Sequence, residues 1–260
     1  MRDSELSALR LRYALVAAAL AALLVGTLMP GANRALFHGI NDWGMHAPRL
    51  WAGLTVLGDT LTALAILLPF AVRRLDVVWL ALMTVLVTSP VVRGLKLAFD
   101  LPRPYAVLPP EQFMVIGNPL SSLSFPSGHS ATVFALAGVL VLGLQLRGLA
   151  FVLVLGLAML AALSRSAVGA HWPMDIAAGA LIGWGGAALG AWLAARWAVR
   201  PHPYLQRGFF GVLLGCTLWL PFHASGYPPG YWMQYLVALG ALGMSVLLLW
   251  GRKPPLSGAP

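Results

Sequence analysis

Residues 148–195 read GLAFVLVLGLAMLAALSRSAVGAHWPMDIAAGALIGWGGAALGAWLAA. Two apolar runs, Gly148 to Leu163 and Met174 to Ala195, make up most of this stretch. Each run approaches the roughly 20 apolar residues that a helix needs to cross a bilayer. The stretch therefore predicts two membrane helices, and Ser164, Arg165, His171 and Asp175 interrupt the apolar sequence around their junction.

The rest of the chain has the same composition. Of its 260 residues, 59% are hydrophobic and only 10% are charged, against roughly 25% charged residues in an ordinary soluble domain. We therefore predict an all-α, polytopic membrane helical bundle of about eight transmembrane helices, built as a single domain over residues 1–260. The six further runs are Leu11 to Met29, Trp51 to Val72, Val77 to Leu95, His129 to Leu146, Gly208 to Phe222 and Tyr231 to Trp250.

The basic residues predict an orientation. If the amino terminus is cytoplasmic, 11 of the 17 Lys and Arg residues fall in inner segments, and such a bias places those segments in the cytoplasm. We therefore expect both termini in the cytoplasm and no nucleic-acid partner, despite the net charge of +9. The inner residues are Arg2, Arg10, Arg12, Arg73, Arg74, Arg147, Arg196, Arg200, Arg207, Arg252 and Lys253. The outer six are Arg34, Arg49, Arg93, Lys96, Arg103 and Arg165.

Two further features of the sequence bear on processing and redox chemistry. The first apolar run could be a cleavable signal peptide, but its length favours an uncleaved membrane anchor. A single cysteine, Cys216, lies in an apolar run, so one chain can form neither a disulfide framework nor a thiolate metal site.

The polar gap from Lys96 to Phe125 lies on the same outer side as the junction after Leu163. Ionisable groups at the ends of membrane spans are costly unless they are paired or used. Three cations and two imidazoles together indicate an anion site, and phosphate suits guanidinium forks best. The converging groups are Lys96, Asp100, Arg103, Ser127, His129, Ser164, Arg165, His171 and Asp175.

The spacing of these groups indicates a reaction. Pro173 suits the first position of a helix, so Asp175 falls in the first turn, where it can orient one ring nitrogen of His171. The other nitrogen is then free to attack phosphorus, while His129 can protonate the departing oxygen. Gly128 and His129 open a helix whose amides point at the anion, and Ser127 can cap that helix or bind phosphate. We expect no metal or cofactor, because Lys96, Arg103 and Arg165 supply the positive charge. Asp100 is expected to pair with Arg103 or Lys96.

Three motifs carry these residues: Lys96-x6-Arg103-Pro104, Pro126-Ser127-Gly128-His129 and Ser164-Arg165-x5-His171-x3-Asp175. In order and spacing they resemble the signature of the type 2 phosphatidic acid phosphatase superfamily, which also includes vanadium haloperoxidases and glucose-6-phosphatase. The resemblance implies a phosphohistidine nucleophile at His171, its partner at Asp175 and the acid at His129. It assigns phosphate binding to Lys96, Arg103, Ser127, Gly128 and Arg165.

The resemblance covers about residues 51–195 and implies a six-helix phosphatase core. The pair of helices expected over about residues 208–250 is additional and has no role in the motifs. The expected activity is a metal-independent lipid phosphatase with its site facing the periplasm or exterior. Candidate substrates are undecaprenyl pyrophosphate, phosphatidylglycerol phosphate, phosphatidate and lipid A phosphates.

Three alternatives use the same residues. A phosphotransferase would pass the phosphoryl group to another lipid instead of water. A vanadium-dependent peroxidase would hold vanadate in a similar site, although eight apolar spans offer a lipid route that halide oxidation does not need. A transporter or non-catalytic lipid-binding protein should carry its charges near the bilayer midplane, whereas these cluster at the ends of spans.

Overall fold

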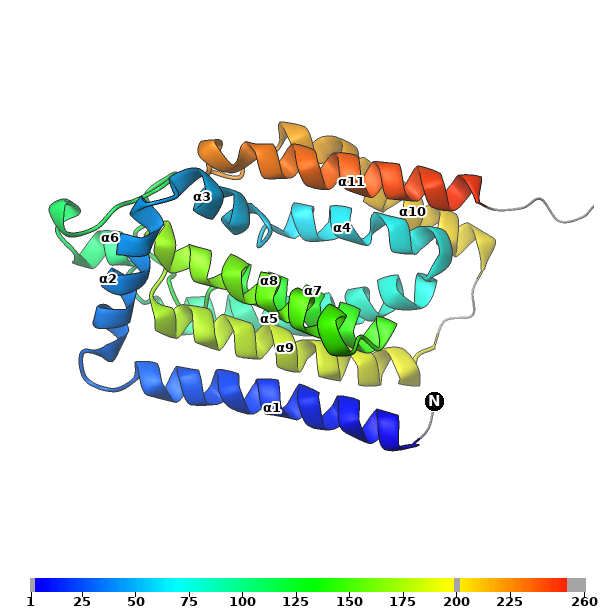
Figure 1. The fold of residues 1–260 in the computed structure, drawn as a ribbon, viewed down its shortest axis with the longest axis horizontal. Coiled ribbons are helices and arrows are strands. Elements are labelled where there is room, and N and C mark those ends of the chain that lie inside the picture. The colour runs from blue at the N-terminus through cyan, green and yellow to red at the C-terminus, as the bar shows by residue number, and fades with distance from the viewer. Residues whose placement is uncertain (1–2, 199–201, 252–260) are drawn as a thin grey trace, which may run out of the picture.

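The computed structural model describes residues 3–198 and 202–251, and every regular element within these ranges is a helix. Most of the long helices run side by side along the long axis of the molecule, while α2 crosses one end (Figure 1). The elements in chain order are α1 (Asp3–Thr27), α2 (Ala32–Met45), α3 (Pro48–Val56), α4 (Thr60–Arg73), α5 (Leu75–Phe99), α6 (Pro104–Val107), η1 (Pro110–Gln112), α7 (Gly128–Leu144), α8 (Gly148–Ala167), α9 (Pro173–Arg196), α10 (Pro203–Trp219), η2 (Leu220–Phe222), η3 (Pro228–Gly230) and α11 (Tyr231–Trp250).

The predicted all-helical membrane bundle is confirmed, but two of the eight predicted runs are not simple spans. Six helices in the described ranges are long and apolar enough to cross a bilayer, or up to seven if one bent pair is counted as a span. The bent pair is α3 and α4, which meet at 62° within the run predicted from Trp51 to Val72. The run predicted from His129 to Leu146 forms α7, which has only 17 residues.

Two neighbouring residues explain the break between α3 and α4. The Asp59 carboxylate caps α4 by accepting hydrogen bonds from the backbone N–H groups of Leu61 at 2.8 Å and Thr62 at 3.4 Å. Gly58 lies against the start of α7, where a Cβ on this residue would stand 2.7 Å from the Cβ of His129. The break therefore brings the chain directly onto a predicted site residue.

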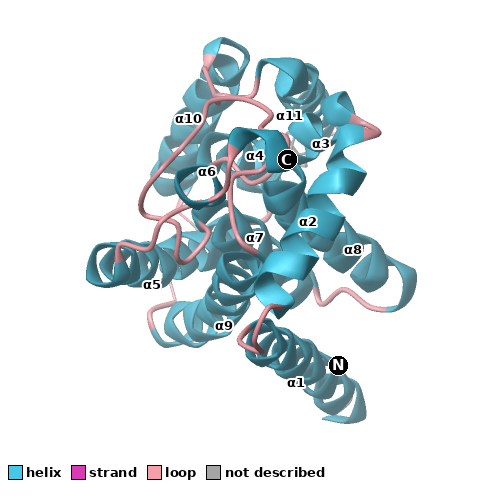
Figure 2. Cartoon of the chain, turned by 90° about the vertical axis from the view of Figure 1, so that its left-hand side faces the viewer, coloured by secondary structure: helices cyan, strands magenta, loops and turns pink. Residues whose placement is uncertain are grey.

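Helix α2 was not predicted, because Arg34 and Asp42 interrupt its apolar residues and it is too short to span a bilayer. Its buried Asn41 ties it to the end of the bundle. The Asn41 side-chain amide donates to the carbonyls of Met114 at 2.8 Å and Ala167 at 3.2 Å. In the end-on view, α2, α6 and the loops gather at this end of the bundle (Figure 2).

Helix α9 packs closely on α7 because glycines replace side chains at their contact. A Cβ at Gly179 would stand 2.3 Å from the carbonyl oxygen of Ser127, and one at Gly183 would stand 2.2 Å from that of Ala131. Such close approach of two backbones is a common use of small residues in membrane helices. The contact sets the start of α7 beside the start of α9.

Helix α1 is packed against the bundle through an aromatic pair. The rings of Tyr13 and Trp184 stack with their centroids 4.0 Å apart. The Tyr13 hydroxyl donates to the Trp184 carbonyl at 2.6 Å, and the Trp184 indole N–H donates back to the Tyr13 carbonyl at 3.0 Å. The polar atoms of two large side chains are thus satisfied inside an apolar contact.

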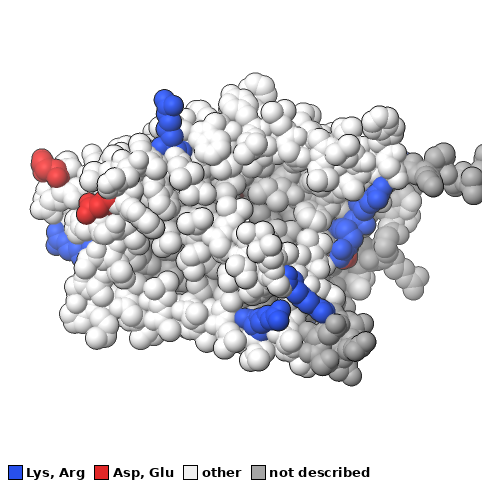
Figure 3. All heavy atoms as spheres, in the orientation of Figure 1, with Lys and Arg blue, Asp and Glu red and all other residues white. Residues whose placement is uncertain are grey.

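The two ends of the bundle carry different charged groups. α1 begins and α4 and α9 end at one end, whereas α5 and α8 end and α7 and α9 begin at the other (Figure 1). Arg73 and Arg196 close α4 and α9 and so lie at the end predicted to be cytoplasmic. On the face shown in Figure 3, charged side chains gather toward the two ends. Four of the predicted inner residues, Arg2, Arg200, Arg252 and Lys253, lie outside the described residues.

Candidate active site

The structure brings the residues of all three motifs to one end of the bundle, although the last of them, Asp175, lies 79 positions after the first, Lys96. Each residue stands at the end of a helix or in a connection. Lys96 is in the last turn of α5, Arg103 precedes α6, Ser127, Gly128 and His129 start α7, Arg165 is in the last turn of α8, His171 follows α8, and Asp175 is in the first turn of α9.

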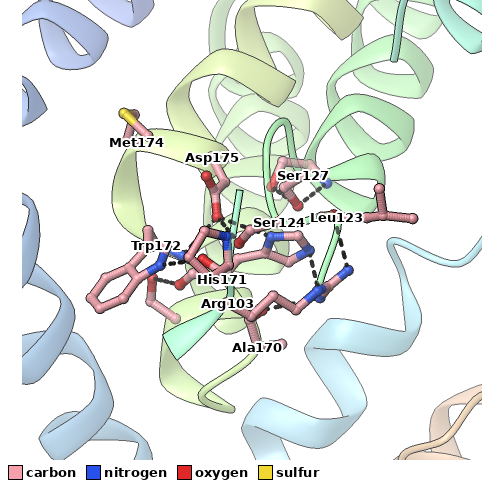
Figure 4. Close-up of polar contacts among 12 residues, drawn as sticks. Arg103, Leu123, Ser124, Ser127, Ala170, His171, Trp172, Met174 and Asp175 are labelled. Atoms are coloured by element: carbon pink, nitrogen blue, oxygen red, sulfur yellow. Dashed lines mark hydrogen bonds and ion pairs between the residues drawn. The ribbon is translucent and has the colours of Figure 1, made fainter. Parts of the chain in front are cut away.

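His171 and Asp175 form a buried pair (Figure 4). The His171 Nδ1 lies 3.2 Å from Asp175 Oδ2, and its Nε2 lies 3.1 Å from the Arg103 Nη1. Because a guanidinium can only donate, Nε2 must be the acceptor and Nδ1 must carry the proton. The neutral imidazole is therefore fixed with its Nε2 lone pair facing the cations. This is the arrangement that the sequence predicted for a nucleophile and its orienting carboxylate.

One of the two carboxylate oxygens of Asp175 accepts all the hydrogen bonds that hold this side chain in place. Its Oδ2 accepts hydrogen bonds from the Ser124 hydroxyl, from the Trp172 backbone N–H at 3.0 Å and from His171. Pro173 occupies the first turn of α9, as predicted, so that the carboxylate also closes the start of this helix. The buried Oδ1 has no hydrogen-bond partner in the described residues.

The pKa of His171 lies well below its usual value, first because the ring is buried and second because Arg103, Arg165 and Lys96 are close by. A lowered pKa keeps the imidazole neutral, and therefore nucleophilic, at pH values below its reference of about 6.5.

A pH profile can check this shift. We expect the acid limb of kcat/KM that belongs to His171 to lie below about pH 6.5. Replacing Arg103 with glutamine removes one repelling cation, which raises the pKa of His171 and moves this limb toward neutral pH. The unmodified protein and Arg103→Gln should be compared on the same substrate, so that ionisation of the substrate contributes equally to both pH profiles. An acid limb that stays in place or moves to lower pH in Arg103→Gln contradicts the assignment.

Lys96 faces the pair from the last turn of α5, and Arg103 faces it from the connection that follows this helix. The Arg103 guanidinium donates to the carbonyls of Ser122 at 2.8 Å and Ala170 at 3.0 Å as well as to His171. The Lys96 ammonium donates to the carbonyl of Leu123. Backbone carbonyls thus hold both cations beside the imidazole, and each keeps further N–H groups for a ligand.

Arg165 is the most deeply buried cation of the site, with 1% of its surface exposed. Its Nη1 donates to the Thr55 hydroxyl at 3.3 Å, and Thr55 also contacts the Ser164 hydroxyl at 2.6 Å. The guanidinium lies over the ring of Tyr227, 5.1 Å from its centroid. Its buried Nε has no acceptor in the described residues. A guanidinium with an unused donor, among other cations, has the chemistry to bind an anion, and this role of Arg165 stays a prediction.

Ser127 and Gly128 start α7 as predicted. The Ser127 hydroxyl oxygen accepts from the Ser130 backbone N–H at 3.3 Å and from the Ser130 hydroxyl at 3.0 Å. Ser127 is therefore the helix cap, one of the two roles predicted for it. A Cβ on Gly128 would meet no atom within 4 Å, so the space beside this helix start is open. Its use as a phosphate site, like the roles of His129 and the three cations, stays a prediction.

The predicted partner of Asp100 is wrong. Among the described residues, Asp100 forms no ion pair with Arg103 or Lys96. It ends α5 in the left-handed conformation, with φ of 36°, and its side chain is exposed. The two cations bind carbonyls instead, which leaves one carboxylate, Asp175, among the three cations of the site.

Two residues of the site were missed by sequence reasoning. Thr55 is a single hydroxyl in an apolar run, and no spacing connects it with Arg165. Tyr227 comes from the connection between α10 and α11, and an aromatic residue near the end of an apolar run is typical of the membrane interface. The structure instead buries it to 4% exposure between Arg165 and His129, whose ring centroid lies 6.5 Å away. The additional helix pair therefore supplies a wall of the site.

Substitution of Tyr227 tests whether this wall matters. A cation–π contact is worth about 0.5 to 2 kcal/mol, so we expect Tyr227→Leu to lower kcat/KM about twofold to thirtyfold. Tyr227→Phe keeps the ring and should retain most of the rate. Tyr235→Leu is the matched control, because Tyr235 is 52% exposed on α11. Equal rates for Tyr227→Leu and the control would show that the contact has no catalytic effect.

An apolar groove begins at the site and continues along the bundle between α4, α5 and α7. It has a volume of about 430 Å³. Lys96 and His129 line its start, and Ala81 and Val139 line its other end. From Lys96 to Ala81 the helix rises about 22 Å, at 1.5 Å per residue. Val85, on its α5 wall, is 42% exposed, so the groove reaches the lateral surface of the bundle.

Comparisons with known proteins agree with this geometry. Residues 76–199 match the model of the PAP2 superfamily, and this segment holds every residue of the three motifs. A similar solved structure is that of Aquifex aeolicus LpxE, with 27% identity and a TM-score of 0.53. The match covers 60% of this chain and 92% of that one. No curated protein matches the chain. Helices α10 and α11 lie beyond the segment that the family model covers.

Proposed function

Since residues 76–199 match the model of the PAP2 superfamily, we propose that the chain is an integral membrane lipid phosphatase. Its substrate is a phosphomonoester or pyrophosphate whose lipid tail stays in the bilayer. The observation that carries the proposal is the buried His171 and Asp175 pair, which faces three cations at the start of an apolar groove. A groove that descends about 22 Å from the site reaches past the middle of a hydrocarbon core about 30 Å thick. A lipid tail can fill such a groove, whereas a soluble phosphate ester has no apolar tail to occupy it.

The reaction proceeds in two displacements. In the first, His171 Nε2 attacks phosphorus, the bond from phosphorus to the lipid oxygen breaks, and His129 gives that oxygen a proton. In the second, His129 takes a proton from water, whose oxygen attacks phosphohistidine, and inorganic phosphate leaves with Nε2 restored. Lys96, Arg103 and Arg165 neutralise the phosphoryl oxygens in both steps, so no metal ion is required.

The protein acts as one membrane domain, with a phosphatase core over about residues 51–195 and the helix pair over about 208–250 as an addition. Both termini face the cytoplasm and the site faces the periplasm or exterior. The charges of the described residues support this orientation, because the arginines that close α4 and α9 lie at the end opposite the site. Candidate substrates are undecaprenyl pyrophosphate, phosphatidylglycerol phosphate, phosphatidate and lipid A phosphates.

The test is release of inorganic phosphate from this panel of lipids by protein purified in mild detergent with a chelator present. We expect release that is insensitive to the chelator. Release that needs an added divalent cation contradicts the metal-independent mechanism. Loss of lipid phosphate without free phosphate, but with phosphorylation of an added acceptor lipid, identifies a phosphotransferase instead.

A further inference from the structure

We propose that Arg93 forms a second anion subsite on the tail side of the catalytic phosphate, and that this subsite selects lipids with a second phosphate between the scissile group and the tail. The proposal rests on the proposed function and narrows its substrate class. Polyprenyl diphosphates and phosphatidylglycerol phosphate have such a group, whereas phosphatidate and polyprenyl monophosphates do not.

The position of Arg93 follows from the helix. Arg93 precedes Lys96 by three residues on α5, so the two cations share one face and stand about 4.5 Å apart along the axis. Both line the groove that starts at His129. Because α5 ends at the site, Arg93 lies one turn farther into the bundle than Lys96, in the direction that a lipid tail follows.

No other role is assigned to Arg93. It is one of the cations on the side where positive residues are scarce, and the three motifs do not include it. Its side chain is exposed, and it forms no hydrogen bond or ion pair within the part of the chain that the structure describes. By contrast, the nearby Lys96 is engaged by the Leu123 carbonyl. An ionisable group inside a membrane span is costly unless it is used, and five N–H donors remain for a ligand.

The opposite wall of the groove does not repel an anion strongly at this level. The carboxylate on this wall belongs to Asp59. Its Oδ1 accepts hydrogen bonds from backbone N–H groups in the first turn of α4, and its Oδ2 lies 3.3 Å from His223 Nε2. The Thr132 hydroxyl on α7 donates to the Gly128 carbonyl. The Asp59 carboxylate and the Thr132 hydroxyl are thus occupied, and Arg93 is the cation one turn below the site that a second phosphate would meet.

The experiment uses two pairs of substrates that differ in the second phosphate. Farnesyl diphosphate is compared with farnesyl monophosphate, and phosphatidylglycerol phosphate with phosphatidate, in the same detergent. For each pair, the kcat/KM of the lipid with the second phosphate is divided by the kcat/KM of the lipid without it. We expect Arg93→Gln to lower this ratio about tenfold to hundredfold, as for loss of one charge-assisted hydrogen bond. Arg49→Gln is the control, because Arg49 is an exposed cation at the same end that does not line the groove.

Each outcome has one meaning. A lower ratio for the farnesyl pair alone supports the subsite and assigns it to a diphosphate, whereas a lower ratio for the glycerolipid pair assigns it to the internal phosphodiester. Unchanged ratios in Arg93→Gln, or the same change in Arg49→Gln, overturn the subsite while the phosphatase proposal stands. Absence of phosphate release from all four lipids by the unmodified protein overturns the proposed function itself.

Discussion

Replacing His171 with glutamine should lower kcat by at least about 10⁴-fold on every lipid phosphate that the protein hydrolyses. The amide can still accept from Arg103 and reach toward Asp175, so the hydrogen bonds around the site have a replacement. It cannot form the bond to phosphorus that the proposed first displacement requires. The effect should therefore fall on kcat, measured as phosphate release under saturating lipid.

Two further measurements separate loss of the nucleophile from loss of the fold. The thermal unfolding midpoint in detergent should stay close to that of the unmodified protein. Denaturation at alkaline pH during turnover of a substrate with labelled phosphorus should trap label on the unmodified protein and none on His171→Gln, because the bond from nitrogen to phosphorus in phosphohistidine is hydrolysed in acid but not in alkali. A His129→Gln protein given an activated aryl phosphate should accumulate the label, because departure of that group needs no acid but hydrolysis still needs a base. Activity within tenfold of normal in a folded His171→Gln protein would falsify the nucleophile assignment.

The sequence was sufficient to predict that the residues of the three motifs lie at the same end of the bundle, because helix ends constrain where they lie. Motifs at the ends of apolar runs share one side of the membrane if the runs cross a bilayer and alternate in direction. Pro173 predicted the start of α9 correctly, and with it the reach of Asp175 to His171. Local rules of capping and spacing were enough for this pair.

Other features depend on contacts between distant segments, which no local pattern shows. The break at Gly58 is required because α7 starts against it, and the run around it is otherwise apolar. Tyr227 reads as an interfacial aromatic until the connection between α10 and α11 is seen to cover Arg165. Asp100 lay near two cations in sequence, but the left-handed end of α5 leaves its side chain exposed. The break at Gly58 and the position of Tyr227 reflect tertiary contacts, and the two cations near Asp100 bind backbone carbonyls from distant segments instead of its carboxylate.

Replacing Arg165 with alanine should lower kcat/KM about 10²- to 10³-fold, which is the range for loss of one preorganised donor to a developing anion. Arg165→Lys should recover only part of this loss, because an ammonium group restores the charge but not the planar fork that binds two oxygens. The measurement is phosphate release from the best substrate of the panel over a range of concentrations.

The stability of the same variants tests why the rate falls. Arg165 is 1% exposed and shares the site with Arg103 and Lys96, while Asp175 is the carboxylate beside them. Burying two arginines and half-burying Lys96 beside one carboxylate costs free energy through desolvation and repulsion, and a bound phosphate relieves that cost. Removing one cation should therefore leave the unfolding midpoint of the phosphate-free protein unchanged or raise it, and should weaken the stabilisation that added orthophosphate gives. A large fall in the midpoint of Arg165→Ala would mean that Arg165 holds the fold through Thr55 and Tyr227, and that the lost activity follows from unfolding.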